Sequence, residues 1–177
     1  MTDFHSFLLA YKCREGKIGM RKAFTMIELI FIILIIGIVA SVALPKLAAS
    51  RDDATSIVCV REASAFITTL HTTYGRVGYQ DFRDLIAADL TNGQVSLTTP
   101  TNSENIFINT KVDTVGVDYY CDGSKVVHFV GNVIGKDYVL TVSAEDIDNV
   151  DTPIGKAAIT KIKENILGGE DNKTYTL

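Results

Sequence analysis

The sequence predicts an α+β fold in which a long N-terminal helix, first transmembrane and then amphipathic, packs on a small antiparallel sheet. Three observations lead to this prediction. Residues 24–44 are almost continuously apolar, residues 94–144 contain five short segments rich in Val, Ile, Thr and Tyr, and residues 153–167 show helical periodicity. The expected parts are a leader (1–23), a membrane helix (24–44), its amphipathic continuation (45–76) and a globular headgroup (77–177).

Charge is distributed unevenly along the 177 residues. The leader carries five basic and two acidic residues, whereas the rest of the chain carries 12 basic and 19 acidic residues. Nucleic-acid binding is not indicated, because binding to a phosphate backbone requires clustered Lys and Arg. The nearest approach to a basic patch is Lys156, Lys161 and Lys163, which we interpret as an ordinary solvated helix face.

The segment from Phe24 to Leu44 predicts a membrane-spanning helix. Its 21 residues, at about 1.5 Å each, give roughly 30 Å of helix, the thickness of a hydrocarbon core. A soluble core helix would carry polar residues on one side, whereas this segment is apolar all round. The basic leader should remain in the cytoplasm, which would place the following residues outside the inner membrane, in the periplasm.

Two other interpretations of this segment remain open from its apolarity alone. A cleaved secretory signal has a shorter apolar region, roughly 7–15 residues long, that ends at a small-residue cleavage site. A plain signal anchor would explain the length but not Glu28, the only ionisable residue between Phe24 and Leu44. A carboxylate inside a membrane is costly unless it is paired or neutralised, so Glu28 indicates a function, although a carboxylate that reaches the headgroups is the simpler alternative.

The string RKAFTMIELIFIILIIGIVASVALPKL closely resembles the N-terminal signature of type IV prepilins and type II secretion pseudopilins. The resemblance implies that prepilin peptidase cuts between Ala23 and Phe24 on the cytoplasmic side and methylates the new amine of Phe24. Ala23 stands where the family usually has glycine, Glu28 takes the place of the family's glutamate, and Pro45 that of a helix-bending proline. Translation from Met20 instead of Met1 would leave the compact leader MRKA and the same mature product.

The resemblance also implies a structural role as a filament subunit. Its expected partners are other pilins or pseudopilins, prepilin peptidase and an inner-membrane assembly platform, in a pilus, a secretion pseudopilus or a DNA-uptake apparatus. Cleavage would create an ammonium group at Phe24, and Glu28 of a neighbouring subunit can pair with it, so that two charges costly alone become tolerable together. The competing hypothesis is a signal-anchored periplasmic binding domain that does not polymerise.

Beyond the membrane segment, Pro45 predicts a kink within a longer helix. Helical periodicity resumes from Ala54 to Tyr74 and should end at Gly75 and Gly78. The residues expected on one face are Ile57, Val60, Ser64, Ile67, Leu70 or His71, and Tyr74. We interpret His71 as a surface or core-edge residue, because no His or Cys cluster accompanies it.

The remaining segments predict a headgroup of short helices and strands. Asp81–Ala88 is expected to form a short helix capped by Asp81, and five extended segments follow. The expected strands are QVSLTT, NIFINT, VGVDYY, KVVHFV and DYVLTVSA. Asp122-Gly123 predicts a hairpin turn, and Pro153–Leu167 predicts an amphipathic helix with Pro in its first turn and glycines after it. The tail EDNKTYTL is expected to be mobile.

Two cysteines follow the leader, in a compartment that oxidises thiols. Cys59 and Cys121 could form a disulfide that joins the long helix to the sheet, at roughly 3–4 kcal/mol of stabilisation, or remain two buried thiols; we favour the disulfide. Cys13 lies in the leader.

The loop SAEDIDNVDTP brings four acidic residues close together in the sequence: Glu145, Asp146, Asp148 and Asp151. Ca²⁺ prefers several carboxylate and carbonyl oxygens, but this loop lacks EF-hand spacing, and a solvated acidic turn is the simpler interpretation. No other cofactor is expected. The sequence contains no Gly-rich phosphate loop and no CxxC, HExxH or GxSxG motif, so we expect no enzymatic activity.

Overall fold

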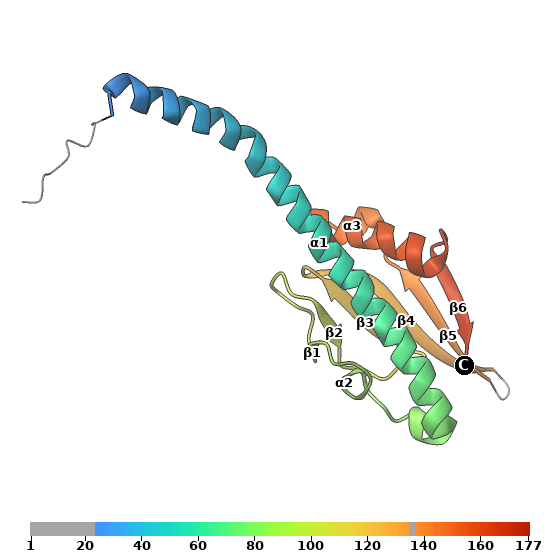
Figure 1. Cartoon of the computed structure of the whole chain (residues 1–177). Helices are drawn as coiled ribbons and strands as arrows, with labels where there is room; N and C mark the ends of the chain where they lie inside the picture. The colour runs from blue at the N-terminus through green and yellow to red at the C-terminus, as the bar shows by residue number, and fades with distance from the viewer. Residues whose placement is uncertain (1–23, 135–136) are drawn as a thin grey trace, which may run out of the picture. The chain divides into compact units, whose positions relative to one another are not determined.

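The computed structural model describes residues 24–134 and 137–177, and the chain divides into two compact units at Leu44 and Pro45. We describe each unit by itself. Ala23 and the rest of the leader lie outside the described residues. The long helix α1 (Met26–Phe82) contributes to both units (Figure 1).

In the first unit, α1 begins at Met26, and no side chain among residues 24–44 is buried. The helix is long enough and apolar enough to cross a membrane, in agreement with the expected span. Pro45 lies inside α1, whose backbone departs from helical φ and ψ angles at Gly78 rather than at the proline.

In the second unit, α1 packs on the sheet through residues one turn apart. The buried positions are Ser56, Cys59, Ala63, Phe66, Leu70 and Thr73. The predicted face is therefore wrong by about one residue, since Ile57 is 50% exposed and Val60, Ile67 and Tyr74 lie at the edge of the core. The buried face includes the small residues Cys59 and Ala63, both fully buried beside the larger Phe66 and Leu70.

The C-terminal end of α1 also differs from the prediction. Gly78 has a φ angle of 73°, which interrupts the helix, but a further turn continues to Phe82. This turn buries Phe82 against Tyr74 and Tyr138, with ring centroids 5.4 and 5.0 Å away. The predicted helix at Asp81–Ala88 is therefore wrong, and the short helix is α2 (Ala87–Leu90).

One six-stranded sheet forms the rest of the headgroup, with strands in sequence order. The strands are β1 (Val95–Ser96), β2 (Ile106–Ile108), β3 (Val117–Cys121), β4 (Ser124–Ile134), β5 (Asp137–Ala144) and β6 (Asn172–Thr176). β1 pairs with β2 in parallel, and all other pairs are antiparallel. The predicted α+β class and largely antiparallel sheet are confirmed.

The hairpin turn between β3 and β4 and the C-terminal helix both form where the sequence predicts them. Asp122 and Gly123 have φ angles of 52° and 74°, so the predicted hairpin turn is confirmed. The predicted C-terminal helix consists of α3 (Pro153–Ile162) and a π-helical turn (Lys163–Leu167) that ends at left-handed Gly168. Thr152 caps α3 by accepting a hydrogen bond from the Gly155 amide at 3.1 Å.

The prediction of a mobile tail is wrong, because residues 172–176 form the edge strand β6 along β5. Its side chains carry little apolar signal, and its ordering comes from backbone pairing. The hydroxyl of Tyr175 adds a hydrogen bond to the carbonyl of Ile166 at 2.9 Å.

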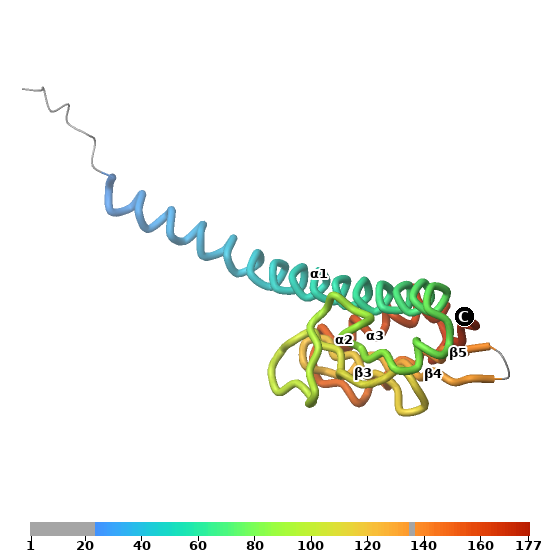
Figure 2. The backbone as a smooth tube through the Cα atoms, turned by 90° about the horizontal axis from the view of Figure 1, so that it is seen from below, coloured from blue at the N-terminus to red at the C-terminus, as the bar shows by residue number. Residues whose placement is uncertain are grey.

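The two longer helices of the headgroup, α1 and α3, cover the same face of the sheet, and Figure 2 shows α1 lying along it. An aromatic cluster forms the centre of this core. Phe107 lies 4.8 Å from Phe66 and 4.4 Å from Tyr119, and Phe66 lies 4.9 Å from Phe129, as ring-centroid distances. The opposite face of the sheet carries half-buried residues of both kinds, polar Asp118 and His128 and apolar Val130 among them.

Candidate functional site

The candidate assembly site is the first turn of α1, around Glu28. The side chain of Thr25 accepts a hydrogen bond from the Glu28 amide at 3.3 Å, and the Glu28 carboxylate accepts two bonds from Thr25, from its amide and its hydroxyl, both at 2.8 Å. This reciprocal arrangement is a capping box. The role of Thr25 was not predicted, although the pattern Thr25-Met-Ile-Glu28 is the sequence signature of a capping box.

The capping box places the carboxylate of Glu28 near the start of the helix, three residues from Thr25. Carboxylates have about four lone-pair positions, so the two bonds from Thr25 leave room for a cation. Phe24, which cleavage would make the first residue, is 77% exposed. Ala23 itself lies outside the described part of the chain.

The surface that follows Glu28 is apolar on every side. Its large side chains are mostly more than half exposed, from Met26 at 81% to Leu44 at 66%. Ser41, a polar residue near the end of this segment, donates to the carbonyl of Ile38 at 2.7 Å and so needs no outside partner. Such a surface is unfavourable in water and suits lipid or other apolar helices.

Cys59 on α1 and Cys121 at the end of β3 form a disulfide with an S–S distance of 2.06 Å. Both residues are fully buried. The favoured disulfide is thus present in the structure, and it links the helix to the centre of the sheet.

A second contact between the same two elements joins Tyr119 and Glu62. The buried hydroxyl of Tyr119 donates a short hydrogen bond to the Glu62 carboxylate. Burial, followed by the hydrogen bond to Glu62, raises the pKa of Tyr119 far above its usual range. The phenol therefore remains a donor at any physiological pH.

A third contact explains the lysines at the end of α3. The ammonium group of Lys161 lies 2.9 Å from Asp53 Oδ1 and 2.7 Å from the hydroxyl of buried Ser56, both on α1. Lys163 lies 2.7 Å from Asp171. Two of the three lysines are therefore engaged within the headgroup, and only Lys156 is exposed in the manner that a solvated face predicts.

Two of the four acidic residues considered for Ca²⁺ have other partners in the headgroup. Glu145 lies 3.7 Å from Lys125 and accepts a hydrogen bond from Asn149, while Asp146 caps a turn by accepting from the Asp148 amide at 3.1 Å. Asp151 lies beside the N-cap Thr152. Within residues 24–134 and 137–177, no group of three or more His, Cys, Asp or Glu side chains is placed to hold a metal ion.

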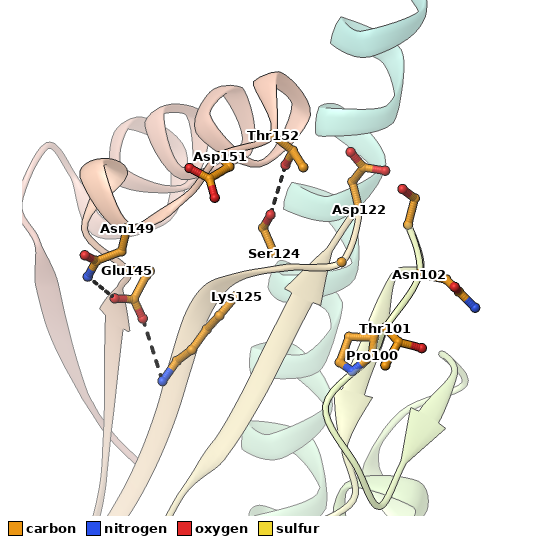
Figure 3. A pocket seen from close by; sticks show the side chains of 12 residues that line it. Pro100, Thr101, Asn102, Asp122, Ser124, Lys125, Glu145, Asn149, Asp151 and Thr152 are labelled. Atoms are coloured by element: carbon orange, nitrogen blue, oxygen red, sulfur yellow. Dashed lines mark hydrogen bonds and ion pairs between the residues drawn. The ribbon is translucent and has the colours of Figure 1, made fainter.

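The loop that carries Glu145 and Asp151 lines a polar groove of about 690 Å³ together with two other segments. Its walls come from the loop at Pro100–Ser103, the β3–β4 hairpin and residues 145–152. Figure 3 shows Asp122 and Asp151 on either side of the hydrogen-bonded pair Ser124 and Thr152, whose hydroxyl oxygens are 3.0 Å apart. The groove therefore presents carboxylates at its rim.

The outer face of the sheet carries a charged cluster that sequence reasoning missed. Asp118 Oδ1 lies 2.7 Å from His128 Nδ1 and 2.8 Å from the ammonium group of Lys125. Burial opposes ionisation of Asp118, but the hydrogen bonds from His128 and Lys125 outweigh it and lower its pKa. The strand register creates this cluster by pairing Asp118 with His128, and no local sequence signal marks it.

The fold and the first turn of α1 define an α+β protein with an apolar N-terminal helix that could cross a membrane. Comparison with family models, curated proteins and solved structures gave no match to this chain. Its function must therefore be inferred from its own residues.

Proposed function

We propose that this chain is a filament subunit of the type IV pilin and type II secretion pseudopilin class. It is inserted in the bacterial inner membrane by one helix, with its headgroup in the periplasm. Prepilin peptidase cuts between Ala23 and Phe24, and the mature subunit enters a pilus or pseudopilus through an assembly platform.

The observation that supports this function best is the position of Glu28. It is the only ionisable side chain between residues 24 and 44, and it lies in the first turn of an otherwise apolar, exposed helix. A plain anchor does not need this carboxylate, which costs several kcal/mol in a membrane unless it is paired or neutralised. The amine of Phe24 in a neighbouring subunit is a partner of the right charge.

The rest of the chain is compatible with this role. The basic leader favours retention on the cytoplasmic side, and the disulfide between Cys59 and Cys121 suits an oxidising compartment. The exposed apolar surface of residues 24–44 can leave lipid and pack against identical helices, which are equally apolar.

The decisive experiment compares Glu28→Ala with Glu104→Ala, a control on an exposed headgroup loop. Both variants should accumulate in the membrane at the level of the original protein. Sheared filaments should fall at least tenfold for Glu28→Ala and stay unchanged for Glu104→Ala. Filaments at the original level in Glu28→Ala cells would contradict the role of Glu28 in assembly, and no filaments from the unmodified chain would favour the signal-anchored periplasmic domain instead.

The processing step has its own test. Mass spectrometry of the mature protein should find an N-terminal peptide that begins at Phe24 and is one methyl group heavier than its sequence predicts. Ala23→Gly should be processed at least as well, whereas a bulky Ala23→Leu should block cleavage. A mature chain that retains the leader would contradict the proposed processing.

A further inference from the structure

The exposed side of α1 in the headgroup carries a basic face that has no partner within the described chain. We define this basic face as Arg51, Ala54, Val58, Arg61, Ala65 and Arg76, all of which are exposed. At 3.6 residues per turn, the three arginines fall within an arc of about 80°. Arg61 lies opposite the buried Cys59 and Ala63, whereas Arg51 and Arg76 lie on the flank of the helix, about 60° and 80° from Phe66.

The arginines of this face are free to bind. None of the three forms a hydrogen bond or ion pair through its side chain among residues 24–134 and 137–177. Three carboxylates lie near this face along the helix: Glu62 is engaged by Tyr119, Asp53 is engaged by Lys161, and Asp52 falls about 100° from Arg51 around the helix. Val58, 42% exposed, adds apolar area beside Arg61.

The same headgroup also carries a surface of the opposite charge, which we define as the acidic rim: Asp122, Asp148 and Asp151. Asp122 and Asp151 line the polar groove of Figure 3, and Asp148 lies on the same loop as Asp151. The side chains of all three lack an ion-pair partner in the described parts of the chain. The ammonium group of Lys125 in this groove lies 2.8 Å from Asp118 and 3.7 Å from Glu145, so it is already engaged by two carboxylates outside the rim.

We propose that the basic face of α1 binds the acidic rim of a second copy of this chain. This inference rests on the proposed filament function and names the contact between headgroups. Two different, complementary surfaces on one chain make a head-to-tail interface, and such an interface generates an open helical filament when its rotation does not close. Complementary charges bring such surfaces together and fix their register.

Charge complementarity favours a second copy over other acidic partners. A surface ion pair contributes little alone, so several pairs and adjoining apolar contact are needed. The two surfaces supply three arginines against three aspartates, with Val58 on one side and the 37% exposed Ile147 next to Asp148 on the other.

The test is a charge exchange in the full chain, assayed as sheared filaments relative to subunit in the membrane. Arg61→Glu with Arg76→Glu should lower filament yield at least tenfold, and Asp148→Lys with Asp151→Lys should do the same. All four substitutions together should restore the yield to within threefold of the original protein. Restoration would also show that each pair of substitutions leaves the headgroup folded.

A matched control changes the net charge equally at other sites. Lys111→Glu with Lys173→Glu alters two exposed lysines that belong to neither the basic face nor the acidic rim and should leave the yield within twofold of the original protein. A tenfold loss in this control would overturn the proposal, because net charge alone would then explain the result. The proposal would also be overturned if the chain with all four substitutions gave a filament yield no higher than either double variant. That result would indicate a different acidic partner, such as an anionic membrane.

Failure of this contact is distinguishable from failure of the filament function. If the unmodified chain forms filaments that require Glu28 and the charge reversals leave them unchanged, only the headgroup contact is wrong. If the unmodified chain forms no filaments, the proposed function fails and this contact fails with it.

Discussion

The hydroxyl of Tyr119 on β3 donates a hydrogen bond to the carboxylate of Glu62 on α1, beside the disulfide that joins the same two elements. Tyr119 is fully buried, whereas Glu62 lies at the edge of the core. The pair therefore fixes the rotation of α1 on the sheet at a point where the helix meets solvent.

Removing this hydroxyl should destabilise the headgroup. Tyr119→Phe keeps the ring packing but leaves the Glu62 carboxylate half-buried and unpaired, at an expected cost of about 1–3 kcal/mol. Glu62→Gln keeps an acceptor and should cost less. Denaturant unfolding of the full chain in detergent measures both, and an equal loss in the two variants would contradict the assigned bond.

Loss of the disulfide should lower stability by about 4 kcal/mol, because the bond closes a loop of 62 residues in the unfolded chain. The variant Cys59→Ala with Cys121→Ala tests this by its unfolding midpoint. A reductant should lower the midpoint of the original protein to a similar degree and leave the variant unaffected. A midpoint insensitive to reductant in the original protein would mean that the cysteines are unbonded.

The Asp118 cluster should make stability depend on pH. The pKa of Asp118 is lower in the folded chain than the unfolded value of about 3.9. The ionised carboxylate therefore contributes to the free energy of unfolding above pH 4, and this contribution is lost as the pH falls through the folded pKa. Asp118→Asn should therefore be less stable than the original protein at pH 6, with a difference that shrinks towards pH 2. A difference independent of pH would contradict this role.

Gly116 should tolerate no side chain. Its φ angle is 85°, and an added Cβ would lie 2.6 Å from the Phe129 carbonyl oxygen and from His128 Cε1. We expect Gly116→Ala to cost more than about 1 kcal/mol. Gly75→Ala is the matched control, because nothing lies within 4 Å of its Cβ and alanine favours the helix by about 1 kcal/mol. Thermal unfolding compares them, and equal midpoints would contradict the prediction.

Local patterns predicted the elements that depend on neighbouring residues. The apolar stretch before Pro45, the turn at Asp122 and Gly123, and the proline and glycines around α3 each carry their own signal. The exact face of α1 was not predictable from apolarity alone, because the helix buries small Cys59 and Ala63 and leaves Ile57 half exposed.

Elements formed by distant residues were missed. β6 is polar in sequence and exists because β5 offers a backbone edge to pair with. The Asp118 cluster depends on the register of β3 and β4, and the engagement of Lys161 with Asp53 depends on how α3 packs against α1. Within the first turn of α1, the glutamate was predictable, whereas its bonding to Thr25 needed the structure.

Three attachments hold α1 to the headgroup within ten residues of helix: Lys161 to Asp53, the disulfide at Cys59, and Tyr119 to Glu62. The disulfide is covalent, and the other two flank it along the helix. A tensile load along α1 would therefore reach the sheet mainly through the covalent disulfide, because the Asp53 carboxylate of the flanking ion pair is 70% exposed and such surface pairs are weak.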